Sequence, residues 1–234
     1  MPVWPPEFVG GRLSEVVPDA GQVLASVFDV RGLVVLVTGG ASRLGLAIAT
    51  VLAECGAVVV MADNNEARLA EAGQDLLAGA RIERAALDVA DADAVGALVS
   101  GIVDRHGRLD AAFANAGIAL GRGPGNEAGL IDTFDLAQWR QALEVNLNGV
   151  VHTVRAAAVP MKRQRGGSIV VTASTAGLRQ DPFVSYAYVV AKAGVINLVR
   201  QAALDLARWQ VRVNAIAPGP FRTNIGGRPP SPEA

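Results

Sequence analysis

The sequence has few of the residues that build disulfides, zinc sites or aromatic clusters. Among its 234 residues there is one Cys and there are two His, and only 5% are aromatic. Cys55 alone cannot form an intramolecular disulfide, and it fits a reducing compartment such as the cytoplasm. His106 and His152 lie far apart with no Cys or His at ligand spacing, so we expect no metal site.

Excess charge and long apolar runs are also missing. The formal net charge is −1, which gives no electrostatic reason to expect nucleic acid or anionic lipid as a partner. Hydrophobic residues make up 51% of the chain, yet no apolar run approaches the roughly 18–20 residues that span a bilayer. We therefore expect no membrane partner. The first residues have no basic segment and no long apolar segment, so no signal peptide is predicted.

The apolar residues occur in short blocks such as LVVLV, VVVMA and SIVVTA, which are typical of strands buried on both faces. Strands are predicted at 34–37, 58–62, 82–87, 111–114, 168–172 and 211–216. Helices are predicted at 44–55, 65–78, 92–105, 136–163 and 185–209, with Asn64 or Asn65 and then Asp91 as N-caps. A distortion is expected near Pro160. This alternation predicts an α/β fold, a doubly wound parallel sheet of Rossmann-like type in a single domain.

Three parts of the chain are distinguished by composition. Residues 1–30 have no sustained periodicity and are predicted to be a flexible extension, with a docking arm for a partner subunit as the alternative. Residues 31–225 form the predicted dinucleotide-binding domain. Residues 226–234 form a short tail.

A glycine-rich segment, VLVTGGASRLGLAIA, spans the first predicted strand and the start of the next helix. Glycines there let the backbone approach a pyrophosphate, and the helix N-terminus offers free N–H groups. Asp63 ends the second predicted strand, eighteen residues after Gly45. A carboxylate there accepts hydrogen bonds from the adenosine ribose and repels a 2′-phosphate, which favours NAD over NADP. A helix N-cap is the alternative role for Asp63, and the two roles are compatible.

Tyr188 and Lys192 are four residues apart in a predicted helix, so their side chains share one face. Tyr186 is six residues from Lys192 and lies well round the helix. A nearby ammonium group lowers the pKa of a phenol, which can then take a proton from an alcohol and return it. The alternative is a core tyrosine beside a lysine that extends to solvent.

Ser174 ends the fifth predicted strand, at the sheet edge where α/β proteins bind ligands. Its hydroxyl can hold a substrate oxygen and stabilise developing charge. Thr172 and Thr175 are competing hydroxyls. A serine hydrolase is not favoured, because no G-x-S-x-G motif surrounds Ser174.

These segments, in this order and spacing, resemble the short-chain dehydrogenase/reductase family as far as about Thr223. The matching motifs are TGGASRLG, LDV, ANAG, VNLNG, ASTAG, YVVAK and APGPFRT. The resemblance implies a cofactor site formed by Gly39, Ser42, Arg43, Leu44, Gly45, Asp63, Asp88, Val89, Asn115, Ala116, Gly117, Tyr188, Lys192, Pro218, Gly219, Phe221 and Thr223.

The resemblance also implies catalytic roles. Tyr188 is the acid/base, and Ser174 is preferred as the oxygen anchor because it lies three residues before a glycine, as in the family. Lys192 lowers the pKa of Tyr188 and binds the nicotinamide ribose. Asn146 holds a water that links Lys192 to solvent, with a helix-packing asparagine as the alternative.

Two residues depart from the family pattern. Arg43 stands where the family usually has the middle glycine, and its side chain is expected to point outward, from where the guanidinium could reach a phosphate. Ala114 replaces the first asparagine of the family's NNAG motif. That change removes one side-chain hydrogen bond within the sheet and is expected to affect stability more than chemistry.

Only RPPSPEA follows PGPFRTNIGG, whereas the family continues with a substrate-covering segment, a helix and a seventh strand. We expect these elements to be missing, which would open the substrate site and expose an edge strand. The sequence predicts an NAD-dependent enzyme that interconverts a secondary alcohol and a ketone. The alternative is a cofactor-binding scaffold or a subunit of a hetero-oligomer. In the family the two long helices pair between subunits, which implies a homodimer or homotetramer.

Overall fold

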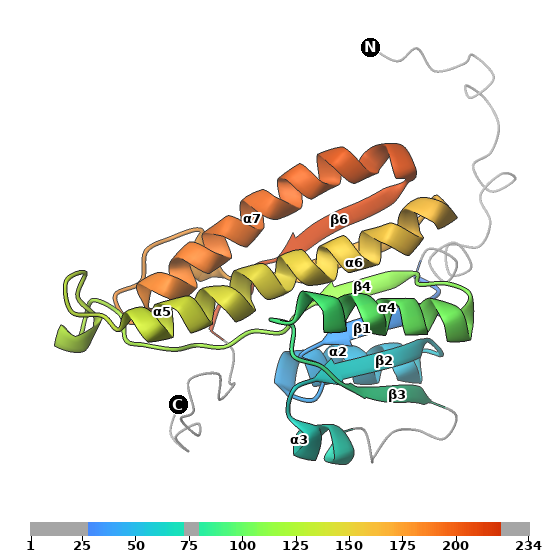
Figure 1. The fold of residues 1–234 in the computed structure, drawn as a ribbon, viewed down its shortest axis with the longest axis horizontal. Coiled ribbons are helices and arrows are strands. Elements are labelled where there is room, and N and C mark those ends of the chain that lie inside the picture. The colour runs from blue at the N-terminus through green and yellow to red at the C-terminus, as the bar shows by residue number, and fades with distance from the viewer. Residues whose placement is uncertain (1–27, 73–79, 221–234) are drawn as a thin grey trace, which may run out of the picture.

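The computed structural model describes residues 28–72 and 80–220, and its strands and helices alternate along the chain (Figure 1). The strands are β1 (Val34–Thr38), β2 (Val58–Asp63), β3 (Arg81–Ala86), β4 (Ala111–Ala114), β5 (Gly167–Thr172) and β6 (Val211–Ile216). The α-helices are α2 (Arg43–Glu54), α3 (Glu66–Glu71), α4 (Ala92–His106), α5 (Leu136–Leu143), α6 (Gly149–Gln164) and α7 (Tyr186–Leu206). The predicted extension, apart from residues 28–30, and the predicted tail lie outside the described residues.

The strands form one parallel sheet in the order β3-β2-β1-β4-β5-β6. The chain moves outward in one direction from β1 to β3 and in the other from β4 to β6. The switch point therefore lies between β1 and β4, where open α/β sheets bind ligands at the carboxyl ends of their strands. This topology confirms the predicted doubly wound, Rossmann-like sheet in a single domain.

The helices cover the two faces of the sheet through two apolar clusters. Alternate side chains of β1 point to opposite faces: Val34 and Leu36 belong to the cluster with α4, α6 and α7, whereas Val35 and Val37 belong to the cluster with α2 and α3. All four are nearly inaccessible to solvent. A strand with apolar residues on both faces is stable only when both faces are covered, which explains the continuous apolar runs in the sequence.

Two helix starts agree with the predicted caps. Asn65 accepts a hydrogen bond from Arg68 N at 2.9 Å, and Asp91 accepts from Asp93 N and Ala94 N at 3.0 and 2.9 Å. Helix α3 is shorter than predicted, because Ala72 already has an extended backbone. The remainder of the predicted helix falls in residues 73–79, outside the described ranges.

The predicted helix over 136–163 is divided at a different place than expected. Residues Glu144–Asn148 form one π-helical turn between α5 and α6. Pro160, where a distortion was predicted, lies buried inside the continuous helix α6. The expectation was therefore wrong about the position, because the break follows a long-range contact of Asn146 rather than the missing N–H of the proline.

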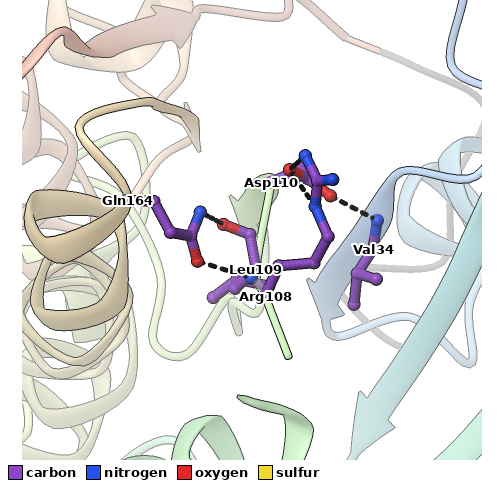
Figure 2. Close-up of polar contacts among 5 residues, drawn as sticks. All are labelled: Val34, Arg108, Leu109, Asp110 and Gln164. Atoms are coloured by element: carbon purple, nitrogen blue, oxygen red, sulfur yellow. Dashed lines mark hydrogen bonds and ion pairs between the residues drawn. The ribbon is translucent and has the colours of Figure 1, made fainter. Parts of the chain in front are cut away.

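Polar side chains join the amino ends of β1 and β4 to the end of α6 (Figure 2). Gln164 pairs with both backbone groups of Leu109: its Oε1 accepts from Leu109 N, and its Nε2 donates to Leu109 O, each at 2.9 Å. Asp110 Oδ2 accepts from Val34 N at 2.8 Å, and its Oδ1 accepts from Arg108 Nε at 2.8 Å. These contacts fix the sheet at the end opposite to the carboxyl ends of its strands.

The longest α-helix of the described ranges, α7, still contains charged residues such as Lys192 and Arg200. Within residues 28–72 and 80–220, no helix is both long and apolar enough to cross a membrane.

Candidate active site

A groove of about 1520 Å³ follows the carboxyl ends of the strands and continues to the start of α7. It brings together most of the predicted site residues: Gly39, Ser42, Arg43, Leu44, Gly45, Asp63, Asp88, Val89, Asn115, Ala116, Gly117, Ser174, Tyr188, Lys192, Pro218 and Gly219. Asn146 does not line the groove and lies just behind it. Phe221 and Thr223 fall outside the described residues.

The turn between β1 and α2 is shaped by two close backbone approaches. Gly39 has φ +63°, and a Cβ there would lie 2.7 Å from Ala116 Cα. A Cβ on Gly45 would lie 2.0 Å from Gly39 O. Only glycine fits both positions. Arg43 has φ +49°, a conformation that favours glycine, at the position where the family usually has one. Its side chain lines the groove.

Asp63 holds the glycine-rich turn in place. Its Oδ2 accepts from Ala41 N at 3.2 Å, and its Oδ1 accepts from Asn65 N at 3.0 Å. The N-cap of α3 is Asn65 rather than Asp63. Each carboxylate oxygen has lone pairs left for a further donor, so Asp63 can bind a ligand hydroxyl while it supports the turn.

Asn115 joins three strands beside the switch point. Its Nδ2 donates to Thr38 O at 3.2 Å and Gly39 O at 3.3 Å, and its Oδ1 accepts from Thr172 Oγ1 at 3.0 Å. Thr38, which sequence reasoning missed, is 1% exposed. Its Oγ1 donates to Phe113 O and accepts from Asn115 N. A lone polar residue at the end of an apolar strand block was the available signal.

Ser174 is held at the end of β5 and faces Tyr188. Its Oγ accepts from Ala176 N at 3.1 Å, and a hydrogen bond between Ser174 and the Tyr188 phenol favours the ionised phenol. The two competing hydroxyls are placed differently. Thr172 is bonded to Asn115, and the backbone of Thr175 begins the short 3₁₀ turn that Ser174 caps.

The two tyrosines lie on different faces of helix α7. Tyr188 lines the groove with Lys192, and Lys192 Nζ lies 5.5 Å from the centre of the Tyr188 ring. Tyr186 instead packs against Phe134, with ring centres 5.6 Å apart. The arrangement follows from helical geometry, since residues four apart share a face and residues six apart do not.

Burial governs the ionisation of both Tyr188 and Lys192. Lys192 is 3% exposed, and its Nζ donates to Thr172 O at 2.7 Å. Burial lowers the pKa of its ammonium group to about 8. Burial also raises the pKa of Tyr188, and the hydrogen bond from Ser174 opposes that rise. The expected lowering by the Lys192 ammonium is opposed by burial, which is the larger influence on the pKa of Tyr188.

Asn146 is fully buried in the π turn and holds the chain that follows β4. Its Oδ1 accepts from Ile118 N at 2.9 Å, and its Nδ2 donates to Ile118 O at 2.8 Å. A Cβ on Gly117 would lie 2.9 Å from Asn146 Oδ1 and 3.8 Å from Lys192 Nζ. Asn146 Oδ1 and Lys192 Nζ therefore both lie close to Gly117, and each polar atom of the amide has one bonding position left. Single π turns are frequent at functional sites.

The groove fits a dinucleotide. Gly39 and Gly45 line the groove without side chains of their own, and α2 begins there with the N-cap Ser42, whose side chain does not occupy the helix N–H groups. A helix N-terminus of this kind binds anions. Asp63 at one end and Lys192 at the other offer an acceptor and a donor for two ribose rings.

Comparisons with known proteins agree with this geometry. The family described as short chain dehydrogenase matches residues 33–233. A cis-4-hydroxycyclohexanecarboxylate dehydrogenase from Sinomonas cyclohexanicum is 41% identical over 80% of this chain and 72% of its own length. A D-beta-hydroxybutyrate dehydrogenase from Rhizobium meliloti (strain 1021) is 34% identical over 79% of this chain and 69% of its own.

Solved structures show the same fold. The crystal structure of an NAD⁺-bound xylitol dehydrogenase is 34% identical and superposes with a TM-score of 0.76, covering 81% of this chain and 71% of the other. The chain therefore belongs to the short-chain dehydrogenase family, and it is an oxidoreductase with a Rossmann fold.

Proposed function

We propose that the protein is an NAD-dependent oxidoreductase that interconverts a secondary alcohol and a ketone, with Tyr188 as the acid/base. The observation that carries this proposal is the convergence of Ser174, Tyr188 and Lys192 in the same groove as the glycine-rich turn and Asp63. Relatives named for hydroxycyclohexanecarboxylate and hydroxybutyrate act on secondary alcohols, which supports the same reaction class here.

Each catalytic residue has a role that its position supports. A nicotinamide dinucleotide, when bound, would supply the hydride acceptor for oxidation of the alcohol carbon and the hydride donor for reduction. The Tyr188 phenolate takes the hydroxyl proton as the C=O double bond forms, and the phenol gives that proton back in the reverse direction. The Ser174 hydroxyl holds the substrate oxygen and favours the ionised phenol. Lys192, whose Nζ lies 5.5 Å from the centre of the Tyr188 ring, binds the nicotinamide ribose and adds positive charge.

Asn146 acts behind these residues. Its amide fixes Ile118, and both Asn146 Oδ1 and Lys192 Nζ lie close to Gly117. The bonding positions that remain on the amide can hold a water, which would connect Lys192 to solvent during proton transfer. We therefore keep the predicted water-holding role for Asn146 as part of the proposal.

Asp63 supports NAD rather than NADP. Its carboxylate ends β2 at the groove and would repel a 2′-phosphate. Arg43 and Arg68 line the same end, so the preference is a balance between one carboxylate and two guanidinium groups. NADH and NADPH titrations followed by fluorescence test it. Tighter binding of NADH is expected, and weaker binding of NADH than of NADPH would contradict the proposal.

A panel of secondary alcohols with NAD tests the reaction itself. Formation of NADH with at least one member is expected. Tight NADH binding with no turnover across hydroxy acids, cyclic alcohols and polyols would contradict the proposal and favour a cofactor-binding scaffold instead.

We also propose a homodimer or homotetramer formed through the long helices. Several apolar side chains on these helices are exposed: Leu136 on α5, Val159 on α6, and Val190 and Leu204 on α7. Pairing between subunits would remove them from water. Sedimentation equilibrium measures the mass directly, and a monomer at micromolar concentration would contradict this proposal.

A further inference from the structure

Two loops meet at the catalytic end of the groove. One follows β4 and contains Arg122 and Gly123, and the other precedes α7 and contains Pro182 (Figure 1). Gly125 N donates to Pro182 O at 2.7 Å. A Cβ on Gly123 would lie 2.4 Å from Pro182 O. The loops are therefore packed backbone against backbone, and they form one wall beside Ser174 and Tyr188.

Each loop brings an arginine to this wall. Arg122 and Arg179 both line the groove that contains Ser174 and Tyr188, and both are exposed. Arg179 follows directly after the turn that Ser174 caps, and its N–H donates to Thr175 O. Among the residues that the structure describes, neither guanidinium group makes a hydrogen bond or an ion pair. Each therefore has its donors available to a ligand.

The acidic groups at this end already have partners within the chain. Asp181 Oδ1 accepts from Phe183 N at 2.9 Å, and Glu144 Oε2 accepts from Asn148 Nδ2 at 2.8 Å. The first bond shapes the loop before α7, and the second lies along the helix. The wall therefore offers an anion two guanidinium groups whose charge no neighbouring carboxylate neutralises by an ion pair in the described chain.

Apolar residues line the groove together with the arginines and the catalytic residues. Ile118, Leu120, Phe183 and Val184 line the same groove, and Phe183 is 85% exposed. An apolar lining of this kind favours a hydrocarbon ligand over a polyol.

We propose that the substrate is a secondary alcohol, or the matching ketone, on a hydrocarbon skeleton that also carries a carboxylate, and that Arg122 and Arg179 bind this carboxylate. The alcohol oxygen lies at Ser174 and Tyr188, and the hydrocarbon covers the apolar side chains. Guanidinium groups bind carboxylates through paired N–H···O bonds. This inference rests on the proposed oxidoreductase function and names its substrate class.

A binding experiment tests it without requiring turnover. Cyclohexanecarboxylate and its neutral analogue cyclohexanecarboxamide are titrated into NADH-loaded protein by calorimetry. NADH is used because its nicotinamide carries no positive charge that could attract the acid by itself. The acid is expected to bind about tenfold more tightly than the amide, the factor that a charge-assisted hydrogen bond supplies.

Variants identify the residues responsible. Arg179→Gln and Arg122→Gln should each weaken binding of the acid by about tenfold while binding of the amide stays the same. Arg163→Gln, an exposed arginine in the last turn of α6, is the matched control and should change neither. NADH affinity reports that each variant is folded.

Three results would overturn the inference: equal affinity for acid and amide in the unmodified protein, no binding of either, or an unchanged preference in both single variants. None of them depends on the alcohol panel. Turnover of neutral alcohols alone would leave the proposed oxidoreductase function intact while the carboxylate inference fails.

Discussion

Burial shifts the pKa values of Lys192 and Tyr188 in opposite directions. Burial disfavours charge, so it lowers the pKa of the lysine to about 8 and raises the pKa of the tyrosine. Both shifts favour the neutral forms. Oxidation of an alcohol needs the phenolate and reduction of a ketone needs the phenol.

Tyr188→Phe removes the proposed acid/base and keeps the ring. The rate constant kcat should fall about 10²–10⁴-fold, the contribution of general acid–base catalysis, while the Kd for NADH stays within about twofold of the original. Steady-state kinetics and NADH fluorescence measure the two quantities. Tyr186→Phe is the matched control, because Tyr186 packs on Phe134 outside the groove. Equal losses in both variants would contradict the assignment.

Lys192→Met tests the cost of the buried charge through pH. Between pH 8 and 10.5 the unfolded chain keeps the lysine proton and the folded chain releases it, so the free energy of unfolding rises with pH in this window. The free energy of unfolding of the original protein, relative to that of Lys192→Met, should therefore rise by about 2 kcal/mol between pH 7 and pH 10. Urea denaturation at both pH values measures the difference.

Lys162→Met is the control for this experiment, because Lys162 lies at the surface with its Nζ 3.7 Å from Asp205 Oδ2. The free energy of unfolding of Lys162→Met should change with pH by the same amount as that of the original protein over this range. If the curve of Lys192→Met also ran parallel, Lys192 would not lose its proton near pH 8.

Among the local elements, the turn between β1 and α2 has a measurable strain. Arg43 adopts φ +49°, where a Cβ costs about 1–2 kcal/mol. Arg43→Gly and Arg43→Ala both remove the guanidinium group, but only glycine removes the Cβ. Arg43→Gly should therefore be more stable than Arg43→Ala by about 1 kcal/mol in urea denaturation.

The same pair of substitutions at Arg68 provides the control. Arg68 lies in the helix α3, where glycine is less favourable than alanine by about 0.5–1 kcal/mol. The order of stability should reverse there. The same order at both positions would show that the backbone of Arg43 is not the cause.

Elements that depend on local pattern were predictable, and those that depend on distant contacts were not. The apolar blocks located β1, β2 and β5 because both sheet faces are covered. The proline rule placed the helix distortion at Pro160, but the π turn occurs at Asn146, whose amide pairs with Ile118. Because Asn146 and Ile118 are far apart in the sequence, helical periodicity gives no indication of their contact.

In the candidate site, too, the features that depend on local pattern were predictable and those that depend on distant contacts were not. The spacing of Tyr188 and Lys192 selected one tyrosine, because helical geometry is local. The direction of the Tyr188 pKa could not be predicted, since it depends on burial by several elements. Thr38 was missed for a related reason: its hydroxyl acts only where β1 and β4 are adjacent, and strand order is a property of the folded sheet.

At the scale of the whole molecule, the two ends of the sheet have different tasks. The carboxyl ends of the strands bear the glycine-rich turn, Ser174 and the loops that form the groove. At the amino ends, Asp110 and Gln164 join β1, β4 and α6 through hydrogen bonds to the backbone (Figure 2). Substitutions at the amino ends should therefore change global stability and leave the chemistry of the groove unchanged.

Gln164→Ala tests this separation. The change leaves the N–H and C=O groups of buried Leu109 without their side-chain partner, so the free energy of unfolding should fall by about 2–3 kcal/mol. Gln201→Ala, at an exposed position of α7, should stay within about 0.5 kcal/mol of the original protein. Urea denaturation measures both, and NADH titration of the folded variants should give unchanged affinity. A loss of NADH affinity in Gln164→Ala with no change in unfolding would show that the two ends of the sheet are coupled.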